Sequence, residues 1–270
     1  MSGELLGHRL EGERGEVVLL LNGGMMTHAS WAPVSAGLLE AWRVLGCDFR
    51  GQLRSPGEAH PRLIDHVPDL VALLDALGLG AVHVLGVSFG AEVGLLLAAL
   101  HPARVRTLAA VTAADRSPPG MREDSRALQA LAREALAGGD PNAFHDAVAR
   151  GVYSAGFRDL HADELAARRA RSLALPASWY SGLLGILAAI EEFDLAPWLG
   201  RIACPTLVVG AALDTVMPAE RVRALAAAIA GAELAVHPDS GHGLVVEDPR
   251  WLAGAYREFL ARRAGAGRGE

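Results

Sequence analysis

The sequence predicts an α/β fold, a doubly wound and mostly parallel sheet that carries an inserted helical segment. Short apolar runs with the length and composition of buried strands alternate with helix-like stretches. These runs are 17–21, 81–85, 105–111, 205–210 and 232–236. The third and fourth lie roughly ninety residues apart, far more than a crossover in such a sheet needs. A chain of 270 residues that is 51% hydrophobic can bury one large core and still carry this insertion.

The run at 81–85 leads into the stretch 86–90, which reads Gly-Val-Ser-Phe-Gly, and then into an apolar helix. This matches the Gly-x-Ser-x-Gly pattern that mounts a nucleophilic serine on a strained strand-to-helix turn. Gly86 and Gly90 stand where a Cβ would collide with the neighbouring turn. Three fixed positions also occur together by chance, so the competing interpretation of Ser88 is a glycine-flanked loop serine.

The long insertion has a helical sequence. Apolar residues at three- and four-residue spacing, with breaks rich in glycine and proline between them, predict helices at 124–136, 141–152, 162–173 and 178–190. We therefore divide the chain into a core domain of residues 1–114 and 198–270 and a helical lid of residues 115–197.

Two later segments supply the acid and the base that a nucleophilic serine needs. Asp214 lies just beyond the strand at 205–210, and His242 follows the strand at 232–236 on a Gly-His-Gly loop that we expect to be flexible. In this strand-turn-helix context the required order along the chain is Ser, then Asp, then His. Parallel strands end at one edge of the sheet, where such side chains can meet. The sequence thus predicts a catalytic triad of Ser88, Asp214 and His242.

These three motifs in order make the chain resemble the α/β-hydrolase superfamily over nearly its whole length. The resemblance implies an α/β-hydrolase fold in which the loop after residue 21 forms part of an oxyanion hole. The backbone N–H groups of Phe89 and Gly24 would hold the oxyanion, with the N–H of Met25 as the alternative to that of Gly24. The chain departs from the family at Asn22, where a histidine is usual, so the role of that histidine is open.

A further match to the family lies at residues 47–55, where a structural role competes with a catalytic role for a second acid. Its sequence from Asp48 onward resembles the family's Asp-x-Arg-Gly loop, although leucine stands where a second glycine is usual. We interpret Asp48 and Arg50 as a charge-assisted hydrogen-bonded pair that fixes this loop.

A lid in this family covers the serine and supplies one wall of the substrate pocket. The aromatic residues of the inserted helices are therefore predicted pocket residues: Phe144, Tyr153, Phe157, Trp179 and Tyr180. His28, and Trp31 at the family's usual aromatic position, are further predicted substrate contacts. The competing interpretation is packing inside the protein for the aromatic residues and a solvent-exposed helix start for His28.

Composition excludes several classes of partner. The formal net charge of −6 and the lack of any Arg-rich run argue against nucleic acid. No basic leader precedes a long apolar stretch, and no apolar run is long enough to span a bilayer, so we expect a cytoplasmic protein without a membrane partner. Cys47 and Cys204 are predicted free thiols, and no metal or other cofactor is predicted. We expect a monomer or homodimer that binds a small molecule.

The predicted function is that of a serine hydrolase. It would cleave a small to medium, mostly apolar ester, lactone or thioester through an acyl-enzyme intermediate. Serine at position 88 argues against the dehalogenases and epoxide hydrolases, which carry aspartate there. Three alternatives stay open: a C–C bond hydrolase of ketone ring-fission products, acyl transfer or cyclisation in a biosynthetic pathway, and a hydrolase-like ligand receptor with little turnover.

Overall fold

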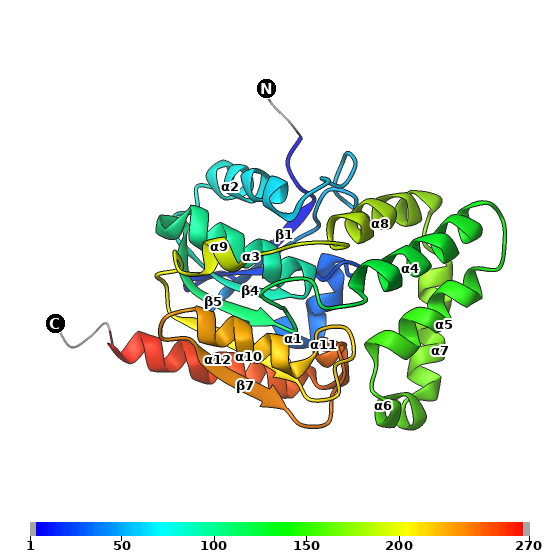
Figure 1. Ribbon diagram of the computed structural model, residues 1–270. Helices are drawn as coiled ribbons and strands as arrows, with labels where there is room; N and C mark the ends of the chain where they lie inside the picture. Colours follow the sequence, from blue (N-terminus) through cyan, green and yellow to red (C-terminus); the bar gives the residue numbers. More distant parts are fainter. Residues whose placement is uncertain (1–3, 267–270) are drawn as a thin grey trace.

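A single twisted sheet organises the protein (Figure 1). The structure, a computed structural model, describes residues 4–266. Within these residues seven strands form the sheet in the order β1-β3-β2-β4-β5-β6-β7, with β1 antiparallel to β3 and all other neighbours parallel. The strands are β1 (His8–Glu11), β2 (Val17–Leu21), β3 (Arg43–Cys47), β4 (Val82–Val87), β5 (Val105–Val111), β6 (Thr206–Ala211) and β7 (Glu233–His237). The predicted doubly wound, mostly parallel sheet is confirmed.

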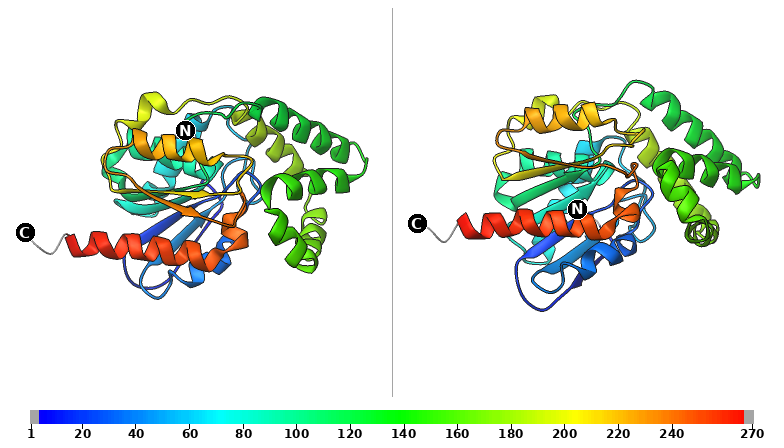
Figure 2. Two further views of the ribbon diagram at one scale, coloured as in Figure 1. Left: turned by 60° about the horizontal axis from the view of Figure 1, so that its bottom comes forward. Right: turned by 90° about the horizontal axis from the view of Figure 1, so that it is seen from below.

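The central strands are apolar on both faces because helices cover both faces. Every residue of β2 and β4 is buried, which explains their unbroken apolar sequences. One face carries α2 (Val67–Ala76), α3 (Phe89–Leu100), α9 (Ala196–Leu199) and α10 (Ala219–Ala228). The other carries α1 (Ala32–Ala36), α11 (Leu244–Glu247) and α12 (Pro249–Ala266). In Figure 2 α10 and α12 lie on opposite sides of the strands.

Three 3-10 helices complete the core, at His28–Trp31, Leu63–His66 and Pro102–Arg104. Between β5 and α9 the chain leaves the sheet and forms a separate group of helices beside it (Figure 1). These are α4 (Met121–Leu136), α5 (Pro141–Val152), α6 (Ala155–Leu160), α7 (Ala162–Leu173) and α8 (Ala177–Ala189), called the inserted helices below. The sequence predicts all of them except α6, a six-residue helix that follows the capping residue Ser154.

The chain enters and leaves the inserted helices at one place, called the neck below. Arg116 and Asp194 form an isolated antiparallel bridge there. The Ser117 amide donates to the carbonyl of Phe193 at 2.9 Å, and the Leu195 amide donates to the carbonyl of Asp115 at 2.8 Å. The inserted segment therefore starts and ends on adjacent stretches of chain.

None of the helices in residues 4–266 is, by itself, both long and apolar enough to cross a bilayer. The pair α7 and α8 meets the length and composition together, but the two helices are bent by 103° at their junction.

Candidate active site

Ser88 lies on a strained turn between β4 and α3. Its φ is 49° and its ψ −125°, a conformation that L-residues rarely adopt and that is typical of a nucleophile elbow. A Cβ on Gly90 would lie 2.4 Å from the carbonyl oxygen of Leu21, and one on Gly86 would lie 2.7 Å from the backbone nitrogen of Ala91. Both glycines are therefore required sterically, as the sequence predicts.

Asp214 and His242 are in direct contact. The Nδ1 of His242 lies 2.9 Å from Oδ2 of Asp214, and the Asp214 side chain is completely buried. The other carboxylate oxygen accepts the backbone N–H groups of Val216 and Met217, both at 2.8 Å. A carboxylate that accepts at both oxygens places the imidazole proton on Nδ1, so Nε2 is left with a free lone pair.

The three predicted triad residues end up at one edge of the sheet. Ser88 follows β4, Asp214 follows β6 and His242 follows β7, and these parallel strands all end on the same side. The two later loops are tied together by hydrogen bonds from the Ala212 amide to the His237 carbonyl (2.8 Å) and from the Leu213 amide to the Ser240 carbonyl (3.0 Å). The arrangement can present a hydroxyl, an imidazole base and an orienting acid to one substrate.

Asn22, which replaces the family's histidine, connects the core to the loop of Gly23 and Gly24. Its amide donates to Asp48 and to Gln52, both at 3.0 Å, and its oxygen accepts from the indole of Trp31 at 2.9 Å. Gln52 in turn donates to the carbonyl of Gly23 at 2.9 Å. Sequence reasoning noted Asn22 only as a departure from the family, and it missed Gln52. Their signal is the polar position directly after a buried strand and the glutamine within the Asp-x-Arg-Gly loop.

The predicted oxyanion groups lie at the ends of two elements. Phe89 is the first residue of α3, where a backbone N–H has no acceptor within the helix. Gly24 follows β2, and a Cβ there would lie 3.1 Å from Cγ2 of Ile186 in α8. Met25 packs against the apolar cluster of the inserted helices. The inserted helices therefore cover the loop after β2.

The predicted pair of Asp48 and Arg50 does not form. Arg50 makes a two-point ion pair with Asp69 at 2.7 and 2.9 Å, whereas Asp48 accepts the backbone N–H groups of His28 and Arg54 at 2.6 and 3.1 Å. Both side chains fix the loop, but each does so through a different partner. Pairing within the loop was the wrong inference, because Arg50 is long enough to reach α2.

The predicted pocket residues lie in three different parts of the protein: the inserted helices' apolar cluster, the surroundings of the histidine loop, and the core near Asn22 and Asp48. Phe144, Trp179 and Tyr180 lie in the inserted helices' own apolar cluster, where His145 also meets the Tyr180 hydroxyl at 2.9 Å. Tyr153 lies against Gly243, beside His242, and Phe157 stacks on His161 and contacts Tyr153 at a tilt. Trp31 is 1% exposed beneath Asn22, and the His28 side chain faces Asp48. Of these, Tyr153 lies next to the predicted base.

A buried carboxyl lies one helical turn after the elbow. Burial raises the pKa of Glu92 in α3 to about 8, and the residue has no exposed surface. The core next to Ser88 therefore holds an acid that stays protonated at neutral pH. In the part of the chain that the structure describes, no three His, Cys, Asp or Glu side chains are grouped in a way that could hold a metal ion.

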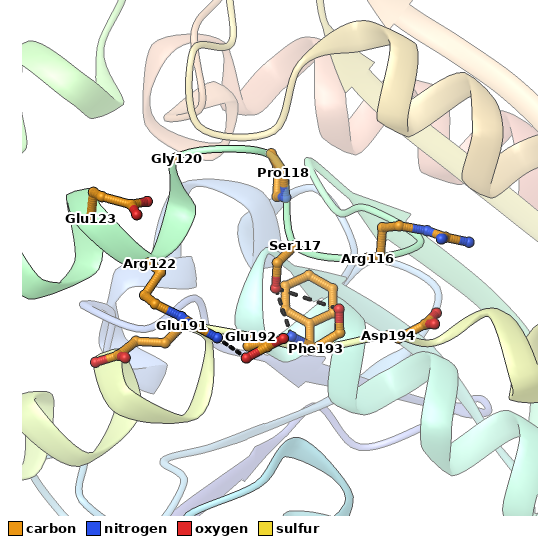
Figure 3. A pocket seen from close by; sticks show the side chains of 10 residues that line it. All are labelled: Arg116, Ser117, Pro118, Gly120, Arg122, Glu123, Glu191, Glu192, Phe193 and Asp194. Carbon is orange, nitrogen blue, oxygen red and sulfur yellow. Dashed lines mark hydrogen bonds and ion pairs between the residues drawn. The ribbon is translucent and has the colours of Figure 1, made fainter.

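A polar pocket of about 370 Å³ lies at the neck and is lined by none of the three triad residues (Figure 3). Within it Arg122 forms an ion pair with Glu192.

A family model described as the α/β hydrolase fold matches residues 16–249. The chain belongs to the α/β-hydrolase family. Among curated relatives, the provisionally named carbamate hydrolase RutD of Caulobacter vibrioides is 32% identical over 248 residues, which cover 91% of this chain and 90% of that protein.

Two solved structures of hydrolases are also similar. The enol-lactonase from Burkholderia xenovorans is 28% identical, with a TM-score of 0.84, and the match covers 95% of this chain and 96% of that one. A thermophilic esterase from Thermogutta terrifontis is 26% identical, with a TM-score of 0.81, and the match covers 95% and 93%. The family and these relatives support hydrolase activity for the chain.

Proposed function

We propose that this α/β hydrolase is a serine hydrolase that cleaves a small to medium, mostly apolar ester, lactone or thioester. The observation that carries the proposal is the contact of His242 with the buried Asp214 at the sheet edge where Ser88 stands in its strained turn. A serine hydroxyl is a weak nucleophile unless a base takes its proton, and this edge offers such a base with its Nε2 free.

In the proposed reaction, Nε2 of His242 accepts the Ser88 proton while Oγ bonds to the substrate carbonyl carbon. Asp214 holds the imidazole and stabilises the imidazolium. The amides of Phe89 and Gly24, with Met25 as the alternative to Gly24, stabilise the oxyanion. The leaving group then departs with the proton from His242. Water, deprotonated by the same imidazole, attacks the acyl carbon and releases the acid from Ser88.

We assign residues 115–197 the role of a lid over a core of residues 1–114 and 198–270. The approach of Ile186 to Gly24 supports this role, because it puts an apolar helix face over the proposed oxyanion loop. Met25, next to the proposed oxyanion loop, and Tyr153, beside the histidine loop, would add apolar surface to this wall. Such a wall favours an apolar acyl group over a charged one.

A carbamate is the second candidate substrate. The 32% identity to the provisionally named carbamate hydrolase favours it. A carbamate carbonyl reacts with serine in the same way as an ester carbonyl, and the leaving group is an alcohol or an amine.

We infer a cytoplasmic enzyme that binds a small molecule and neither nucleic acid nor membrane, as a monomer or homodimer without a cofactor. Cys47 and Cys204 are free thiols, which supports a reducing compartment.

The test is labelling with a fluorophosphonate probe, read by intact mass, with turnover of p-nitrophenyl esters of increasing chain length and of a p-nitrophenyl carbamate. The Ser88→Ala variant is expected to lose the label and about 10⁴- to 10⁶-fold in kcat. Ser181→Ala, an exposed serine on α8, is the control and should keep both. Labelling without turnover of either substrate type would point instead to C–C hydrolysis, acyl transfer or a receptor. An active, labelled Ser88→Ala variant would overturn the proposal.

A further inference from the structure

The junction between α5 and α6 lies against both loops that carry the predicted acid and base. The Gly243 amide, next to His242, donates to the carbonyl of Val152 at 2.8 Å. The Thr215 hydroxyl, next to Asp214, donates to the carbonyl of Gly151 at 3.2 Å. The inserted helices thus contact the catalytic edge of the core at a point far along the chain from the neck.

Glu247 forms the strongest part of this contact. One carboxylate oxygen accepts the backbone N–H groups of Gly241 at 3.1 Å and of Ser154 at 3.0 Å. The other accepts the Ser154 hydroxyl at 2.6 Å. A carboxylate that accepts three hydrogen bonds forms stronger bonds than a neutral acceptor would. One side chain therefore bridges the histidine loop and Ser154, the residue that caps α6.

The two glycines beside His242 owe their identity to the same contact. A Cβ on Gly241 would lie 2.8 Å from the Ser154 nitrogen and 2.9 Å from the Val152 oxygen. A Cβ on Gly243 would lie 2.7 Å from the ring of Tyr153. The Gly-His-Gly sequence, which we expected to make a flexible loop, allows the inserted helices to approach closely on both sides of the histidine.

We propose that Glu247 is a positioning residue that fixes His242 through the inserted helices. This rests on the proposed function. The residues on both sides of His242 are hydrogen-bonded, Gly241 to Glu247 and Gly243 to Val152, while Asp214 holds the imidazole itself. The inserted helices then do more than cover the substrate, because they are one of the supports of the loop that carries His242, the proposed base for Ser88. Displacement of a catalytic group by about 1 Å costs on the order of 10²-fold in rate.

The variants that test this are Glu247→Ala, Glu247→Gln and Ser154→Ala, with Glu258→Gln, an exposed acid on α12, as the control. We expect Glu247→Ala to lower kcat on a short p-nitrophenyl ester about 10- to 100-fold with little change in KM, because the substrate still binds but the base is misplaced. Glu247→Gln should recover most of the rate, since its amide oxygen can accept the two backbone N–H groups and its NH₂ can donate to the hydroxyl.

Hydrogen exchange of the Gly241 and Ser154 amides gives a readout that does not depend on catalysis. Exchange at both should speed up in Glu247→Ala and not in Glu258→Gln, with the melting temperature showing that both variants are folded. Faster exchange with kcat unchanged would show a bridge that does not position the base and would overturn the proposal. Unchanged exchange would overturn the bridge itself. A wild-type protein with no Ser88-dependent turnover would overturn the proposed function, and the positioning role with it, whatever the exchange shows.

Discussion

The catalytic edge of the core and the inserted helices differ in how much added side-chain volume they can accept. At the edge, β2 and β4 are wholly buried, and both glycines of the elbow face backbone atoms that cannot move aside. In the inserted helices, α7 has no buried residue, and a Cβ on Gly151 or Gly156 would meet nothing within 4 Å. The edge thus allows few substitutions, whereas α6 and α7 allow many. Within the inserted helices α8 is the exception, because a Cβ on Gly182 or Gly185 would collide with the loop that contains Gly51 and Ala59. The first region holds the proposed catalytic groups, and the second is constrained where it meets the core, as at Ser154 and Glu247.

The largest expected difference in stability is between two glycine-to-alanine variants, one in each region. Gly90→Ala drives its Cβ against the carbonyl oxygens of Leu21 and Asn22, at 2.4 and 2.5 Å. We expect it to lose more than about 3 kcal/mol of unfolding free energy, and its esterase activity with it. Gly156→Ala, on α6, is the matched change in the open region and should be neutral or stabilising by up to about 1 kcal/mol. Denaturant unfolding measures both, and equal costs would remove the contrast.

A smaller effect concerns the buried acid of the core. The pKa of Glu92 is about 8 in the folded protein against an ordinary 4.5, so the folded state binds one more proton than the unfolded state between these values. Stability contributed by this group is therefore lost as pH rises. Glu92→Gln mimics the protonated carboxyl. Relative to the wild type, the unfolding free energy of this variant should rise by roughly 1 kcal/mol per pH unit from about pH 5 to pH 8.

Thermal melts across that pH range measure the difference. Glu134→Gln, an exposed acid on α4, is the control from the inserted helices and should track the wild type at every pH. If the melting temperature of Glu92→Gln follows that of the wild type in parallel across this pH range, Glu92 is ionised in the folded core.

The smallest effect lies inside the inserted helices. Tyr180→Phe leaves the buried Nε2 of His145 without its 2.9 Å partner and should cost about 1 to 2 kcal/mol of stability. The double variant His145→Phe/Tyr180→Phe should recover part of this, because no polar group is left unpaired. For both variants kcat on a short ester should stay at the wild-type value. A drop in kcat would show that this cluster reaches the reacting atoms, and the two regions would no longer be separable.

The sequence predicts most of the fold because the signals for strands and elbow are local. The predicted strand at 105–111 coincides with β5, and the helices predicted at 141–152 and 162–173 coincide with α5 and α7. The two glycines of the elbow are explained by contacts with their own turn and with β2. The short helix α6 was missed because six residues carry too little periodicity to be seen.

The candidate site is only partly predictable, because its supports are distant in the chain. The order of Ser88, Asp214 and His242 predicts a common sheet edge, but the bridge from Glu247 to Ser154 spans 93 residues and leaves no local pattern. Periodicity predicts apolar faces on the helices that carry Phe144 and Trp179 without saying what covers those faces. The structure shows that both residues pack in the inserted helices' own cluster. The partners of side chains that contact distant parts of the chain, as Arg50 does, cannot be predicted from local sequence and become visible only in the structure.

The neck has a consequence for how such a protein can be rebuilt. Since Arg116 and Asp194 pair directly, the segment between them leaves the sheet and returns to it at one point. Replacing that segment therefore leaves the order of the strands unchanged. A foreign helical cassette whose ends match this bridge can be grafted onto the core as a module. To leave the histidine loop in place, the graft has to bring its own carbonyl for the Gly243 amide and its own capping hydroxyl for Glu247.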